Sequence, residues 1–177
     1  MQTRGLWFRR RIAAWAAVAI ASVPGCLAHS PDASPRIDAG DEVAVMSVLD
    51  RFMDSLNALD MEGHVATYHF PHFRHAHGEI VVWQDAMEAM PVLAAPPEKR
   101  RAILRQALEP DWHRSEWTRR EIVQAGPDKV HVATRFERLR EDGSMIKAFD
   151  SLYVMTLETD AQGKRRWGIR GRSSYAP

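Results

Sequence analysis

The sequence predicts an α+β domain in which helices come first and an antiparallel sheet follows. Its last third, residues 112–174, consists of four alternating segments separated by three Gly- and Asp-containing turn sequences: Ala125-Gly126-Pro127-Asp128, Glu141-Asp142-Gly143-Ser144 and Asp160-Ala161-Gln162-Gly163. Strands of about ten residues joined by such turns form an antiparallel meander. Upstream of the meander, apolar residues recur at helical spacing. We therefore expect the N-terminal helices to cover one face of the sheet.

Length and composition are those of one soluble globular domain with room for a targeting segment. The chain has 177 residues, of which 45% are hydrophobic and 27% charged. The formal net charge is +1, but the first 25 residues hold four arginines and no acid. Without them, 20 basic residues remain against 23 acidic ones, a net charge of about −3. We expect no nucleic-acid partner, because a nucleic-acid-binding domain carries a basic excess on one face.

The first 26 residues are predicted to be a signal peptide. Basic residues precede Ile12–Val23, a run of twelve apolar and small residues that is shorter than the roughly 20 of a membrane-spanning helix. Cys26, the one cysteine of the chain, follows a glycine at the end of this run and resembles the lipidated cysteine of the bacterial lipobox, with Pro24 as a departure from that motif. Simple secretion with cleavage after Ala28, or a retained membrane anchor, are the alternatives. We expect an exported protein, periplasmic or anchored as a lipoprotein, that contacts the membrane only through this segment.

Residues 27–40 are predicted to be a flexible linker, because they contain prolines and a glycine without any periodicity. The folded domain is then expected over residues 41–177. Asp41 can cap a helix over residues 42–58, around which apolar residues recur at helical spacing: Val45, Leu49, Phe52, Leu56 and Leu59. Shorter elements are predicted before the sheet: a helix capped by Asp60 that extends to about Tyr68 and is ended by Pro71, two strands over 72–83 that turn at Gly78-Glu79, a helix with the capping-box residues Asp85 and Glu88, and a helix from Pro97 to Leu108.

The turn positions also fix an expected register for the last four strands. If each hairpin closes at its turn sequence, three rows of residues share one face of the sheet, because side chains alternate with a period of two. The rows are Arg119, Thr134, Ser151 and Arg172; Glu121, Val132, Tyr153 and Arg170; and Trp117, Phe136 and Phe149. The opposite face is expected to hold Arg120, Ile169 and a pair formed by Arg135 and Asp150.

This order of helix, short helix, hairpin, helix and long meander resembles the nuclear transport factor 2-like superfamily, which includes polyketide-cyclase-like (SnoaL type) proteins, steroid isomerases and scytalone dehydratase. The resemblance extends over residues 41–177 and is strongest to small uncharacterised single-domain members. It rests on the Leu-Asn-Ala-Leu-Asp run at 56–60 before Tyr68, on Trp167-Gly168-Ile169 early in the last strand, and on the ending Arg172-Ser173-Ser174. It implies a cone-shaped fold in which N-terminal helices cover a curved antiparallel sheet. This fold carries many functions, so the resemblance does not imply one activity.

The first face of the sheet combines aromatic side chains with arginines, which predicts a site for a small anionic or polar molecule. Arg119, Arg170 and Arg172 could not all be buried without anionic partners, and Glu121 can satisfy one. The planar guanidinium binds carboxylate or phosphate bidentately, and the resemblance implies a pocket on this concave face, where some members place arginines. The predicted ligand contacts are Arg119, Arg172, Tyr153, Trp117, Thr134 and Ser151, with Arg74 and His72 at the rim. Alternatively, the arginines lie on an exposed or dimer-forming face in ordinary ion pairs.

Five of the eight histidines lie between residues 64 and 77: His64, His69, His72, His75 and His77. His75 and His77 could ligate a metal with His69 or His72, but no cysteine and few acids accompany them, so we expect neither a metal nor a cofactor. His72 or His75 could instead act as a general base or acid. The resemblance to scytalone dehydratase implies Tyr153 as a partner in water elimination, with Asp150 as a further candidate. Steroid isomerases place a carboxylate base near this strand, just before a proline, and no carboxylate fills that place here.

Three functions therefore stay open. The first is an exported binding domain for a small anionic or polar ligand, a homodimer formed through the outer face of its sheet. The second is a cofactor-independent isomerase, dehydratase or cyclase that works by proton transfer. The third is a structural or partner-binding envelope protein whose interior is filled with side chains.

Overall fold

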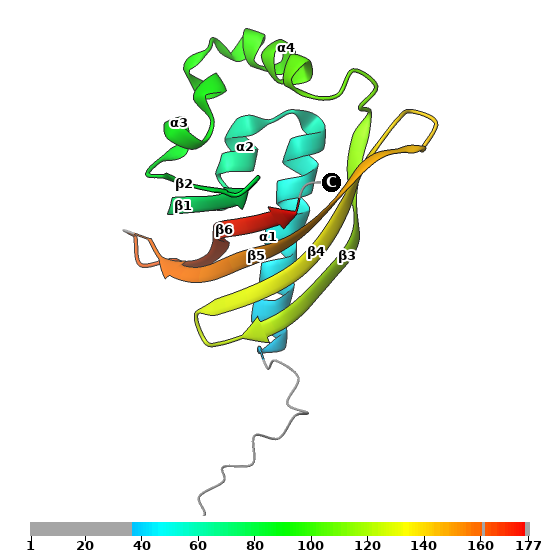
Figure 1. The fold of residues 1–177 in the computed structure, drawn as a ribbon. Coiled ribbons are helices and arrows are strands. Elements are labelled where there is room, and N and C mark those ends of the chain that lie inside the picture. The colour runs from blue at the N-terminus through cyan, green and yellow to red at the C-terminus, as the bar shows by residue number, and fades with distance from the viewer. Residues whose placement is uncertain (1–36, 161, 176–177) are drawn as a thin grey trace, which may run out of the picture. The chain divides into compact units, whose positions relative to one another are not determined.

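A computed structural model describes residues 37–160 and 162–175, which form an α+β domain (Figure 1). The predicted signal peptide, Cys26 and most of the predicted linker lie outside the described residues. The elements follow in the order α1 (Ala39–Ala58), α2 (Met61–Val65), β1 (Tyr68–Ala76), β2 (Glu79–Trp83), α3 (Ala86–Ala89), the 3-10 helix η1 (Pro91–Ala94), α4 (Pro97–Ala107), β3 (Arg114–Ala125), β4 (Lys129–Leu139), β5 (Met145–Thr159) and β6 (Arg165–Tyr175). Among the described helices, none combines the length and the apolar character needed to cross a membrane.

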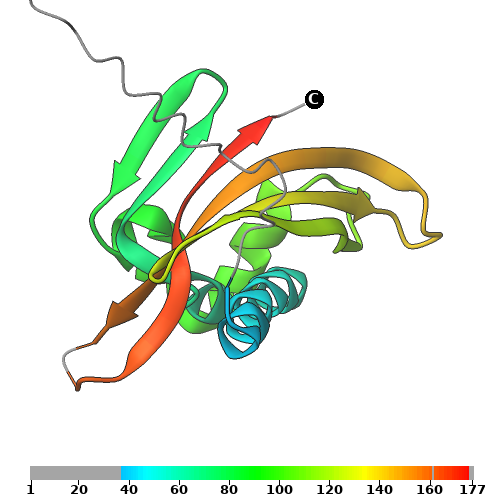
Figure 2. The same cartoon turned by 90° about the horizontal axis from the view of Figure 1, so that it is seen from below.

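The six strands form one curved sheet in the order β2-β1-β6-β5-β4-β3, which does not close into a barrel. Neighbouring strands are antiparallel except β1 and β6, which run parallel. Helix α1 lies along one face of the sheet, while α2, α3 and α4 gather toward one end of it (Figures 1 and 2). The predicted architecture, with N-terminal helices over a curved sheet, is confirmed.

Helix α1 begins at Ala39, earlier than predicted. Its N-cap is Asp38, whose carboxylate accepts a hydrogen bond from the Asp41 amide at 2.9 Å, so the prediction of Asp41 as the cap is wrong. Asp41 lies instead in the first turn, where its carboxylate accepts a hydrogen bond of 2.7 Å from Trp167 Nε1. This bond joins the start of α1 to β6, because Trp167 belongs to that strand.

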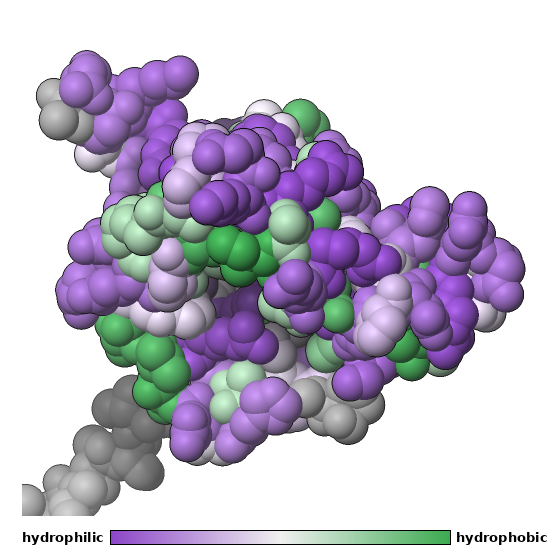
Figure 3. Space-filling view, turned by 90° about the horizontal axis from the view of Figure 1, so that it is seen from above, coloured by the Kyte–Doolittle hydropathy of each residue, from purple (hydrophilic) through white to green (hydrophobic). Residues whose placement is uncertain are grey.

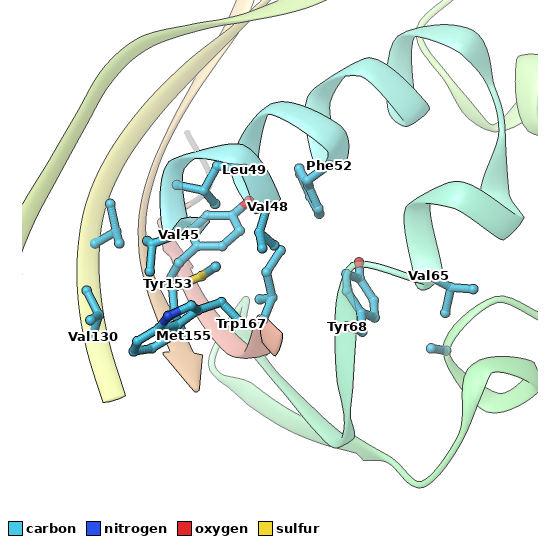
Figure 4. Packing of buried hydrophobic residues seen from close by; sticks show 13 residues of the cluster. Val45, Val48, Leu49, Phe52, Val65, Tyr68, Val130, Tyr153, Met155 and Trp167 are labelled. Atoms are coloured by element: carbon cyan, nitrogen blue, oxygen red, sulfur yellow. The ribbon is translucent and has the colours of Figure 1, made fainter. Parts of the chain in front are cut away.

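The apolar side of α1 packs against the sheet and forms the core. Four of its side chains are no more than 1% exposed: Val45, Val48, Leu49 and Phe52. Figure 4 shows this side of the helix beside strand side chains that are also buried, among them Tyr153, Met155 and Trp167. Fully burying one such side chain stabilises the fold by about 1.5–3 kcal/mol. The burial of these four side chains therefore holds α1 against this face of the sheet and covers it. We call this covered side the concave face.

The second helix is shorter than predicted. Asp60 caps α2 as expected, but the helix ends at Val65, well before the proline that was expected to stop it, and Tyr68 begins β1. Tyr68 is 2% exposed and pairs with Ile169 of β6, so burial in the sheet outweighs its helical spacing. The predicted hairpin of β1 and β2 is confirmed, although it turns at His77-Gly78, where both residues have positive φ as a two-residue type I′ turn requires.

The helices predicted between this hairpin and the meander are also present. Asp85 caps α3 by accepting hydrogen bonds from the amides of Met87 and Glu88. Helix α4 has Pro97 in its first turn and ends one residue before the predicted Leu108. No residue of α4 is buried, so this helix is packed more loosely than α1.

The register of β4 and β5 is confirmed, whereas that of β3 is wrong beyond its first residues. Phe136 pairs with Phe149 and with Trp117 as predicted. A bulge after Trp117 then inserts one residue, so that Arg119 pairs with Arg135 and its side chain reaches Asp150 on the outer face. Because a bulge exchanges the two faces of the residues that follow, here as far as a second bulge after Ile122, Arg120 points to the concave side instead and forms an ion pair with Asp50 of α1.

The register of β5 and β6 is also corrected. Arg172 lies opposite Tyr153, whereas the prediction placed it opposite Ser151. A bulge between Val154 and Met155 turns Ile169 into the core, where it is 0% exposed. Arg170 consequently leaves the concave face and pairs with Glu158. The predicted faces of Ile169 and Arg170 are therefore both wrong, while Arg172 does lie on the concave face.

Candidate functional site

A cavity of about 500 Å³ lies between the helices and one end of the sheet. Its lining comes from α1, α2, β1, α4 and the strands β4, β5 and β6. Figure 3, which looks down on the helices, shows the surface hollowed, with hydrophilic residues inside the hollow and hydrophobic residues beside it. A cavity of this size is in the range of sites for drug-sized molecules, roughly 300–1,000 Å³. The interior of the domain is thus not filled with side chains at this end.

Two arginines face the cavity side by side. Arg74 of β1 and Arg172 of β6 are direct partners in the parallel register, and both line the cavity. Among the described residues no carboxylate forms an ion pair with either guanidinium. Like charges directly opposite each other across strands destabilise a sheet, and burial together with the charge of Arg172 lowers the pKa of Arg74. The two charges therefore have no counter-charge among the described residues.

Aromatic side chains hold Arg172 in place. Its guanidinium carbon lies 5.6 Å from the ring centre of Phe52 and 6.0 Å from that of Tyr153. Its Nη1 donates a hydrogen bond of 3.2 Å to the Tyr153 hydroxyl, and its Nε is buried without a partner in the described structure. Arginine stays charged at any physiological pH, so the packing positions a fixed positive charge with donor capacity to spare.

A second cationic pair borders the same cavity, but this pair has a carboxylate between its two charges. Arg138 of β4 and Lys147 of β5 are cross-strand partners, and Glu109 lies between them at 2.6 Å from Arg138 Nη1 and 3.8 Å from Lys147 Nζ. Burial by itself would raise the pKa of Glu109, but hydrogen bonds and the charge of Arg138 outweigh it and lower that pKa. This pair carries its own counter-charge, unlike Arg74 and Arg172.

His64 is the histidine that faces the cavity with a defined hydrogen-bond pattern, and the sequence interpretation gave it no role. It is 3% exposed, and its Nδ1 lies 3.1 Å from the Phe52 carbonyl oxygen, which can only accept. The Nε2 atom is then the acceptor for the Tyr68 hydroxyl at 3.3 Å. Burial first, and the charge of Arg172 second, lower the pKa of His64 to about 4. Its four-residue spacing from Tyr68 is the sequence signal that could have joined the two.

His72 and His75, the predicted catalytic histidines, do not line the cavity. The His72 ring is 0% exposed and stacks on Tyr68, with ring centres 4.0 Å apart, and on Trp83 at 5.7 Å. Its Nδ1 donates to the Ile169 carbonyl at 2.9 Å. His75 is exposed beside Ser173. Within the described structure no hydrogen bond joins either histidine to Tyr153, so the expected pair is not assembled.

The other predicted contacts do not line the cavity and are divided between the concave and the outer face of the sheet. Trp117, Thr134 and Ser151 lie on the concave face but their bonds stay within the fold, to Leu49 O, Ser151 O and Ser174 Oγ respectively. Arg119 and Asp150, by contrast, are bonded to each other on the outer face, together with Arg135. Across the described residues, no group of three or more His, Cys, Asp or Glu side chains is placed to hold a metal ion.

Comparison with known proteins identifies the family. Residues 41–169 match the family described as NTF2-like protein (DUF6841). The chain belongs to this NTF2-like family. The match covers the helices and the sheet as far as Ile169 of β6, and it confirms the resemblance to the superfamily. A search of curated proteins by sequence found no match.

Solved structures share the NTF2-like fold at low sequence identity. A protein of unknown function with a cystatin-like fold from Nostoc punctiforme is 16% identical, with a TM-score of 0.57 over 80% of this chain and 95% of the other. An NTF2-like protein of unknown function from Pseudomonas putida is 13% identical, with a TM-score of 0.56 over 80% and 90%. A ketosteroid isomerase-like protein from Erwinia carotovora atroseptica is 14% identical, with a TM-score of 0.51 over 78% and 98%. At these identities the likeness shows the fold alone.

The buried histidines predict a marked dependence of stability on pH. The pKa values of His64 and His72 are lowered from 6.5 to about 4 in the folded protein, chiefly by burial. Between these pH values the unfolded chain binds protons that the folded chain does not. Above pH 6.5 these histidines therefore do not lower the free energy of unfolding. Below it, the free energy of unfolding falls toward pH 4, by up to about 1.4 kcal/mol per pH unit for each histidine.

The substitution His72→Phe tests this dependence. Phenylalanine keeps the stacking on Tyr68 and Trp83 but leaves the Ile169 carbonyl without its donor, so stability at pH 7.5 should fall by about 1–3 kcal/mol. Urea denaturation at pH 7.5, 6.0 and 5.0 should also show a shallower pH dependence than in the wild type. An unchanged pH dependence would contradict the assignment of His72 as a buried neutral histidine.

Proposed function

We propose that this NTF2-like domain binds a small anionic molecule in its cavity, with Arg74 and Arg172 as the primary contacts. The observation that carries the proposal is the pairing of these two guanidiniums across β1 and β6, on the lining of the cavity, without a carboxylate among the described residues. Planar guanidinium groups bind carboxylate and phosphate oxygens in a bidentate manner. An anion between the two arginines would attract both and offset their mutual repulsion.

The surroundings favour a preformed site. Tyr153 is 0% exposed, and its hydroxyl holds Arg172 by a hydrogen bond of 3.2 Å. The ring of Phe52 supports the same guanidinium from the side of α1. A charged group held by packing loses little freedom when a ligand binds, and such preorganisation increases affinity.

Binding is better supported than proton transfer, the second function that the sequence left open. His64 is the candidate base at the cavity, but burial and Arg172 lower its pKa to about 4, far from the neutral pH at which a general base works best. Its Nε2 also already accepts a hydrogen bond from Tyr68.

The binding proposal predicts that anions stabilise the protein through Arg74 and Arg172. At constant ionic strength, at least one of acetate, octanoate and inorganic phosphate should raise the free energy of unfolding, by about 2.7 kcal/mol at a hundredfold excess over its dissociation constant. The stabilisation should disappear in Arg74→Met and Arg172→Met. Arg119→Met is the matched control, because Arg119 lies on the outer face with its side chain 52% exposed. Thermal unfolding measures the effect, and the absence of stabilisation by all three anions would refute the proposal.

We further propose that the domain acts after export, attached to a membrane through a lipid on Cys26. The basic start, the apolar run and the cysteine at its end support this proposal. Expressed in a bacterium with a radiolabelled fatty acid, the full chain should incorporate label and fractionate with membranes, while Cys26→Ser should lose the label. Labelling of the Cys26→Ser variant, or an unlabelled wild type, would contradict the lipid anchor.

A further inference from the structure

The lining of the cavity beyond the two arginines is largely apolar. Leu56 of α1, Leu104 and Ala107 of α4, the following Leu108, and Phe136 and Phe149 of the sheet all contribute to it. The remaining charges on this lining, Arg138, Lys147 and Glu109, are already paired with each other. The cavity therefore has one end with unpaired positive charge and a body that would favour hydrocarbon.

The packing of helix α4 also indicates that the body of the cavity suits an apolar group. None of its residues is buried, although Leu104 and Ala107 are turned toward the cavity. Its own residue Arg100 joins it to neighbouring segments: Arg100 pairs with Glu62 of α2 and donates hydrogen bonds to the carbonyls of Ala95 and Leu93. An amphipathic helix gains stability mainly by burying its apolar side. In α4 that side lies over empty space, which an apolar part of a ligand would fill.

The second cationic pair indicates which anion suits the first. Between Arg138 and Lys147, a pair of the same charge on the same sheet, the protein places one carboxylate, that of Glu109. A ligand carboxylate between Arg74 and Arg172 would have the same relation to its two cations.

We infer that the ligand is an amphiphilic carboxylate, with its carboxylate between Arg74 and Arg172 and its hydrocarbon body beneath α4 against Leu104. This inference rests on the proposed anion site and adds the chemical class of its ligand. Small hydrophilic anions reach the arginines but leave the apolar lining uncovered, so they bind more weakly.

A series of straight-chain carboxylates, titrated into the full-length protein by isothermal titration calorimetry, tests the inference. Affinity should rise from acetate through butanoate and hexanoate to octanoate, by about fourfold for each added methylene that becomes buried. Octanamide, which has the same hydrocarbon body without the charge, should bind at least tenfold more weakly than octanoate. Leu104→Ser should lower the affinity for octanoate several-fold and leave that for acetate unchanged, because Leu104 contacts only the hydrocarbon.

The outcomes separate this inference from the anion site itself. If acetate or phosphate binds as tightly as octanoate, and Arg74→Met abolishes that binding, the amphiphilic ligand is refuted and the anion site stands. If octanoate and octanamide bind equally and Arg74→Met has no effect, the cavity is simply apolar and both are refuted. If no member of the series binds, both are refuted as well. Circular dichroism of Leu104→Ser and Arg74→Met shows that the variants are folded.

Discussion

Arg74 and Arg172 lie side by side because β1 and β6 run parallel and pair in register. Their charges repel each other, and the cavity walls displace part of the water that would screen them. Two carboxylates elsewhere on the sheet are engaged with other arginines, Asp150 with Arg119 and Arg135, and Glu158 with Arg170. A positive charge without a protein counter-charge thus faces the cavity, and the account of the site depends on it.

The path of the chain decides which arginines contribute to that charge. The bulge after Trp117 sends Arg119 to the outer face, and the bulge after Val154 does the same for Arg170. Beyond the second bulge, Arg172 returns to the concave face opposite Tyr153. Helix α1 then completes the arrangement, because Phe52 packs against both Tyr153 and the guanidinium. The two bulges therefore place Arg119 and Arg170 in ion pairs on the outer face and leave Arg172 at the cavity with Arg74.

The sequence was sufficient for the architecture and for part of the sheet. Turn sequences and alternation located the four-strand meander, and the register of β4 with β5 was right because no bulge interrupts their pairing from Lys129 to Arg138. It was insufficient for Arg119, because the charged strand β3 lacks the regular alternation that would reveal a bulge. The neighbourhood of Arg74 and Arg172 was also out of reach. Parallel strands have no connecting turn from which a register could be counted.

The histidines show the same limit. His72 was predicted at the rim of a pocket, but its ring is stacked between Tyr68 and Trp83 and bonded to Ile169, a residue 97 positions away. His64 went without a role, although its four-residue spacing from Tyr68 would have placed the two side chains on one face of the predicted helix. For His72, long-range packing, which local spacing does not encode, decides where the imidazole lies.

A double-mutant cycle on the ligand-free protein tests the central claim most directly. Urea denaturation of the wild type, Arg74→Met, Arg172→Met and the double variant yields the coupling energy between the two guanidiniums, and contacting residues commonly couple by about 0.5–3 kcal/mol. The account predicts a repulsive coupling: each single substitution relieves the same repulsion, so the double variant is less stable than the two single effects added together would make it. A coupling of zero, or an attractive one, would contradict the claim that two uncompensated charges meet at the cavity.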